Sequence, residues 1–135
     1  MPRLATLALL VFLSLGAGCA PATSDRALQV SDVKSLSGKW LGYATGTGAG
    51  APNPIELTIS PDGTWTSRMG ALLQTGKVSL DDGKISFARG AASGSSTTVL
   101  QASTAVLQER GGQRVLVGQG RSDFGPYSYE FTEQK

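Results

Sequence analysis

The chain has 135 residues, of which 40% are hydrophobic and 16% charged, so it is long enough for one ordinary domain and too apolar for disorder throughout. It has no His and a single Cys, which excludes an internal disulfide framework, a Cys-based metal site and catalysis by a His general base. Its net charge of +2 is too small for the basic patch of a nucleic-acid-binding protein. We therefore expect no nucleic acid, metal or other cofactor.

The first residues have the pattern of a targeting segment. Arg3 precedes an uncharged apolar stretch at residues 4–15, and small residues follow up to Cys19. This order is typical of a secretory signal peptide, and the apolar stretch is shorter than the ~20 residues that a membrane-spanning helix needs. The sequence predicts a signal-peptide helix within residues 1–18.

Residues 15–19 (LGAGC) resemble the lipobox of bacterial lipoproteins, although Gly16 stands where that family usually has Leu. In the family a peptidase cuts before the cysteine, which then receives diacylglycerol and usually a further acyl chain such as palmitate. The resemblance implies that Cys19 begins the mature chain and anchors it to a membrane, because two or more acyl chains bind stably. Since residue 20 is not Asp, it also implies the cell envelope, on the outer membrane facing the periplasm in a Gram-negative cell.

Residues 19–30 are mostly small and polar, which is typical of a short tether. The rest of the chain, residues 31–135, is expected to form one domain. Residues 31–37 predict a short helical turn capped by Ser31. Apolar and polar residues alternate after this turn, as they do in a strand with one buried face.

Turn sequences separate the alternating segments. Asp-Gly or Gly-Gly pairs at 62–63, 82–83 and 111–112 are typical of tight hairpins. Sequential antiparallel strands favour an all-β fold, a small up-and-down barrel of about eight strands, because closure removes unpaired strand edges. The predicted strands are 38–45, 54–60, 64–69, 74–80, 84–88, 97–108, 114–119 and 127–132.

Two motifs resemble those of the calycin barrels. Residues 36–40 (LSGKW) are similar to the Gly-x-Trp signature of lipocalins and avidins, and residues 122–127 (SDFGPY) to the Thr-Asp-Tyr-x-x-Tyr motif of lipocalins. The resemblance implies a lipocalin-like barrel whose closed end is plugged by Trp40. It does not extend to biotin, because Gly42 replaces the biotin-contacting Asn of avidins. Only eight residues follow Tyr127, too few for the packing Arg and C-terminal helix of a full lipocalin.

We expect that the protein is not an enzyme. Its only Cys is assigned to lipid, and Glu56 and Glu130 fall on the polar faces of their predicted strands. The strongest candidate feature is a set of aromatic residues that are candidates either to face a ligand or to fill the core: Trp40, Trp65, Phe87, Tyr127, Tyr129 and Phe131.

Two functions are open for such a barrel. The family resemblance favours binding of a small apolar or amphipathic ligand between the strands, because ligand pockets are mainly apolar with a few polar groups. Alternatively, the aromatic residues fill the interior, and the barrel is an interaction module for another envelope protein, for example an inhibitor. Such a module would act through loops at 46–54 and 89–96, with Arg89 or Arg121 as anchors. The interior volume discriminates between the two, since eight strands enclose either packed side chains or one small ligand.

The lipid anchor gives a direct test. Metabolic labelling with a palmitate analogue should label the wild-type protein, and Cys19→Ser should abolish the label because the acylated thiol is lost. An unlabelled wild-type protein would exclude the anchor.

Overall fold

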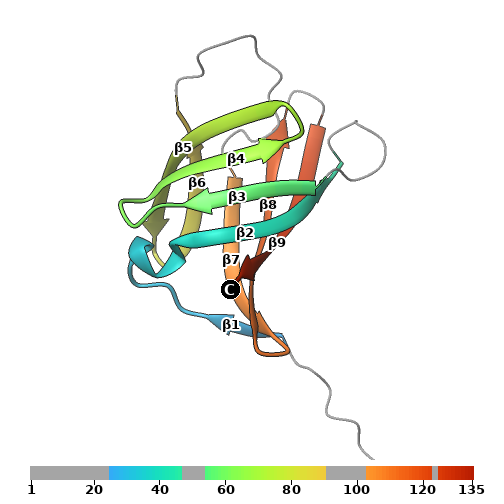
Figure 1. The fold of residues 1–135 in the computed structure, drawn as a ribbon. Coiled ribbons are helices and arrows are strands. Elements are labelled where there is room, and N and C mark those ends of the chain that lie inside the picture. Colours follow the sequence, from blue (N-terminus) through green and yellow to red (C-terminus); the bar gives the residue numbers. More distant parts are fainter. Residues whose placement is uncertain (1–24, 47–53, 91–102, 123–124) are drawn as a thin grey trace, which may run out of the picture.

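The structure is a computed structural model that describes residues 25–46, 54–90, 103–122 and 125–135 (Figure 1). The predicted signal peptide, Cys19, most of the tether, residues 47–53 and 91–96 of the expected loops and the first part of the sixth predicted strand lie outside these residues. No helix in the described ranges is long and apolar enough to span a membrane.

The described residues form nine strands and one short 3-10 helix. In chain order these elements are β1 (Arg26–Leu28), η1 (Val33–Leu36), β2 (Gly38–Thr45), β3 (Pro54–Ile59), β4 (Thr64–Met69), β5 (Leu72–Asp81), β6 (Lys84–Arg89), β7 (Ser103–Arg110), β8 (Gln113–Ser122) and β9 (Gly125–Gln134).

Strands β2 to β9 close into an antiparallel barrel. Each strand pairs with the next one in the chain, and β9 returns to pair with β2, with Gly42 opposite Phe131. Burial alternates strictly along β2 and β3, as the period of two predicted. The predicted all-β, up-and-down barrel is therefore confirmed, and each of its eight predicted strands overlaps one of β2–β9.

The chain before the barrel differs from the prediction. Residues 26–28, expected in the tether, form β1, which pairs with the last part of β7 and places Leu28 opposite Leu107. Val30 is buried in the core, and Leu28 packs against it. Burial of these two apolar side chains holds the segment against the barrel. The mostly small and polar composition of residues 19–30 did not indicate this contact.

The predicted helical turn is present as η1, but its cap is Asp32 and not Ser31. Asp32 Oδ1 accepts a hydrogen bond of 2.9 Å from the backbone N–H of Lys34. This bond satisfies a donor at the start of the turn that has no partner within it. The turn leads directly into β2 and buries Leu36 (Figure 1).

Trp40 closes one end of the barrel, as the family resemblance implied. Its side chain is 1% exposed, and its indole N–H donates a hydrogen bond of 3.1 Å to the carbonyl of Leu36. The guanidinium of Arg114 lies 5.5 Å from the centre of the Trp40 ring, within range of a cation–π interaction. Arg114 also donates to Glu133 Oε1 at 2.7 Å and to the carbonyl of Ser35.

Arg114 lies on β8, and the sequence analysis did not single it out. It joins β8, β9 and η1 around one buried ring. We call this end, with Trp40, η1 and the turn between β7 and β8, the closed end. The opposite end, with the turn between β4 and β5, is the open end.

Truncation of Trp40 tests this arrangement. Trp40→Ala should lower the free energy of unfolding by roughly 3–5 kcal/mol, because it removes a buried ring and leaves a cavity. The neighbouring Leu41→Ala, at a side chain that is 40% exposed, should cost about 1 kcal/mol or less. Urea unfolding followed by circular dichroism measures both, and a cost for Trp40→Ala below about 1 kcal/mol would contradict the closed end described here.

Candidate functional site

The structure places all six predicted aromatic side chains inside the barrel and brings five of them together. The ring centres of Trp65 and Phe87 are 6.2 Å apart, and those of Phe87 and Tyr129 are 6.3 Å apart, both in edge-on contact. Tyr129 continues the cluster to Phe131 at 5.3 Å and to Tyr127 at 6.2 Å. Trp40 is separate from these contacts, with Leu36 and Arg114 at the closed end.

Four of the clustered rings lie opposite a glycine on the neighbouring strand. A Cβ atom at Gly76 would come within 2.6 Å of the Trp65 ring, and one at Gly118 would overlap the Tyr129 ring. The missing side chain therefore leaves space for the rings of Trp65, Tyr129 and Tyr127, whereas at Gly42 it allows close approach of the β9 backbone. The four pairs are Trp65–Gly76, Phe131–Gly42, Tyr129–Gly118 and Tyr127–Gly120.

Little free space remains between the rings. The cavity bounded by Trp65, Phe87, Ser103 and Tyr129, with Leu57 and Phe131, has a volume of about 10 Å³. That volume is about enough for one water molecule, whereas pockets for small organic ligands have roughly 300–1,000 Å³. The described aromatic residues therefore fill the interior in place of lining a ligand pocket.

The interior becomes more polar toward the open end. The side chains of Ser67, Gln74 and Ser103 are buried there, and the hydroxyls of Ser103 and Tyr129 are hydrogen-bonded at 3.1 Å. The indole N–H of Trp65, which borders the same small cavity, is buried without a hydrogen-bond partner in the described part of the chain. These groups give the filled interior a limited capacity to bind a polar atom.

Burial raises the pKa of both interior tyrosines. For Tyr129 the loss of hydration is the largest cause, and the hydrogen bond to Ser103 opposes it. The pKa of Tyr127 is raised in the same direction and for the same reason. Both hydroxyls are therefore neutral at physiological pH and do not supply a charge.

These raised pKa values predict a loss of stability at alkaline pH. An unfolded Tyr ionises near pH 10, whereas the buried Tyr129 keeps its proton, so the unfolded chain binds fewer protons and the free energy of unfolding falls above that pH. Each buried Tyr contributes a slope of up to about 1.4 kcal/mol per pH unit. Tyr129→Phe should reduce the slope, measured by urea unfolding at several alkaline pH values, and an unchanged slope would contradict the assignment.

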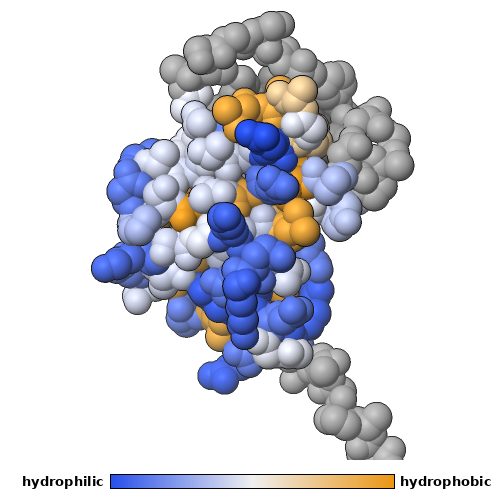
Figure 2. All heavy atoms as spheres, viewed as in Figure 1, coloured by the Kyte–Doolittle hydropathy of each residue, from blue (hydrophilic) through white to orange (hydrophobic). Residues whose placement is uncertain are grey.

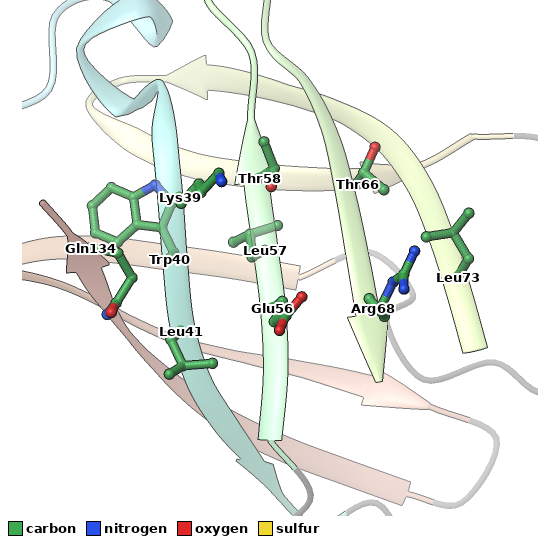
Figure 3. A pocket seen from close by; sticks show the side chains of 10 residues that line it. All are labelled: Lys39, Trp40, Leu41, Glu56, Leu57, Thr58, Thr66, Arg68, Leu73 and Gln134. Atoms are coloured by element: carbon green, nitrogen blue, oxygen red, sulfur yellow. The ribbon is translucent and has the colours of Figure 1, made fainter. Parts of the chain in front are cut away.

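A larger hollow lies on the outer wall, over β2–β5 (Figure 3). Its volume is about 460 Å³. Four of its residues are direct neighbours across the four strands, in the order Leu41, Glu56, Arg68 and Leu73. Figure 2 shows apolar and charged residues side by side on this face. We call this row of four residues and the hollow around it the outer groove.

The outer groove combines exposed apolar side chains with uncompensated charges. Leu41 is 40% exposed and Leu73 is 57% exposed. Glu56 and Arg68 lie opposite each other, yet neither forms an ion pair with the described residues. The sequence analysis did not predict this groove, because the row of four residues depends on the strand register. The available signal was an apolar residue, Leu41 or Leu73, on the exposed face of a strand.

The other predicted sites are placed only in part. Cys19 and most of the two loops lie outside the described residues, and the structure does not describe the side chain of Arg89. Arg121 is exposed near the end of β8. Glu56 and Glu130 are exposed on outer faces, as predicted, and Glu130 accepts a hydrogen bond of 2.8 Å from Arg110. Within the described ranges, no three acidic, His or Cys side chains are grouped to hold a metal ion.

Comparison with known proteins adds no relative: no family model, curated protein or solved structure matches the chain. The barrel interior, the outer groove and the sequence motifs therefore carry the functional argument.

Proposed function

We propose that the protein is a lipid-anchored envelope protein, not an enzyme, whose filled barrel binds another envelope protein through its outer surface. The observation that carries this proposal is the cavity between the described aromatic rings, whose volume of about 10 Å³ is far below that of a pocket for a small organic ligand. The lipobox resemblance at Cys19 supports the anchor, and the outward positions of Glu56 and Glu130 support a non-catalytic role.

The outer groove is the surface that best fits such a partner. Leu41 and Leu73 supply apolar contact at the two sides of the row, and Glu56 and Arg68 supply one charge of each sign between them. Apolar contacts contribute most of the affinity at protein interfaces, whereas complementary charges select the partner and its orientation. A partner segment with a basic and an acidic side chain between two apolar ones is the complement of this row.

A second candidate function is binding of one small polar molecule inside the barrel, at the small cavity between the aromatic rings. The buried indole N–H of Trp65 favours it, because an unsatisfied buried donor costs about 1–3 kcal/mol that a bound acceptor would recover. Such a molecule would have to displace the Tyr129 ring, since the existing cavity is too small.

A probe-binding experiment separates the two functions. The wild-type protein should show no saturable binding of indole or of the apolar dye N-phenylnaphthylamine. Tyr129→Ala, or Tyr129→Leu if the first variant is unstable, should gain binding of indole because it opens a dry cavity in the core. The matched control Tyr43→Ala removes a ring that is 53% exposed and should gain nothing.

Saturable binding by the wild-type protein would overturn the filled-barrel proposal. Native mass spectrometry of protein purified from its own envelope gives an independent result. A retained added mass of small-molecule size favours the second candidate, and a bound polypeptide of defined mass favours the first.

A further inference from the structure

We infer that the closed end of the barrel faces the lipid surface and that the open end points away from it. This inference rests on the proposed lipid anchor at Cys19. It follows from where Asp25 is held, which contacts hold it, and how few residues separate it from Cys19.

The first described residue, Asp25, is held at the closed end by Arg110, the last residue of β7. Arg110 Nε donates to Asp25 Oδ1 and Arg110 Nη2 donates to Asp25 Oδ2, both at 3.0 Å. The third nitrogen, Nη1, donates to Glu130 Oε1 at 2.8 Å. A bidentate ion pair of this kind fixes the orientation of the Asp25 carboxylate as well as its distance from Arg110. Asp25 is therefore held beside the turn between β7 and β8.

Strand β1 strengthens this attachment. Its three residues pair with β7, and Arg26 lies opposite Glu109, a cross-strand neighbour of opposite charge. Val30 is then buried in the core, and Leu28 packs against the core. A pull on the anchor therefore acts on β7 and on buried side chains at the closed end (Figure 1).

The distance to the anchor is short. Five residues, 20–24, separate Cys19 from Asp25, and a chain spans at most about 3.6 Å per residue, so Asp25 lies within about 22 Å of Cys19 in any conformation. The eight residues of β2 cover about 23 Å along the strand, and less along the barrel axis because barrel strands are tilted. The tether limits the distance of the closed end from the lipid directly, whereas the open end lies a further barrel length away from the point of attachment.

Charge at the closed end does not set this orientation. Exposed Arg26, Lys34 and Lys84 are balanced by exposed acidic residues in the neighbouring turns, Asp32, Asp62 and Asp81. A surface with both signs is not attracted strongly to anionic lipid. The orientation set by the covalent anchor is therefore expected to persist at high salt, unlike an electrostatic one.

Energy transfer on vesicles tests the orientation. Full-length lipidated protein is placed in phosphatidylethanolamine–phosphatidylglycerol vesicles that carry an acceptor dye on their headgroups. A donor dye is attached at Gln113→Cys, at the closed end, or at Ala71→Cys, at the open end, where both positions are exposed. Transfer should be at least about twofold more efficient from position 113, because the tether limits its distance to the headgroups. The difference should not change when the salt concentration is raised.

Two variants test whether the contact between Arg110 and Asp25 sets the orientation. Arg110→Ala releases Asp25, frees β1 to lengthen the tether and should reduce the difference between the two positions. Lys77→Ala, which removes a 3.5 Å ion pair with Asp62 at the same end, should leave it unchanged. Equal transfer from both positions in vesicle-bound protein would overturn the orientation alone. Protein that does not float with the vesicles would contradict the anchor, and the orientation with it.

Discussion

The constraint on which the rest of this structure depends is the pairing of large inward rings with glycines on the adjacent strands. A ring of eight strands is just wide enough for its side chains, so a large inward ring is accommodated best beside a residue that has no side chain. Gly76, Gly118 and Gly120 provide this space for Trp65, Tyr129 and Tyr127. The barrel can therefore close around a dense aromatic core, and the cavity between the described rings has a volume of about 10 Å³.

A filled interior moves the functional question to the surface. The predicted antiparallel barrel is present, but the use of that architecture depends on its interior volume, and fold does not fix function. The outer groove is the described feature with exposed apolar groups and unpaired charges in one row, from Leu41 to Leu73. An anchor at the closed end would leave this wall and the open end accessible from the aqueous side.

Much of the fold was predictable because its signals are local. Alternation of burial and Asp-Gly or Gly-Gly turns located all eight strands of the barrel, and Trp40 was placed from a short motif. The features that were missed depend on contacts between distant residues. Strand β1 exists through its pairing with β7, and Arg114 reaches the Trp40 ring from another part of the sheet. The glycine–aromatic pairs and the outer groove likewise require the strand register, which the sequence pattern did not specify.

The polar groups of the closed end and of the aromatic cluster differ in how they are satisfied. At the closed end the Trp40 indole and the Arg114 guanidinium have partners on η1 and β9, and Arg110 binds two carboxylates. Within the aromatic cluster, the Trp65 indole N–H is buried without a partner in the described residues. An unpaired buried donor lowers stability, whereas the partners at the closed end add to it. The closed end is therefore suited to hold the chain to its anchor.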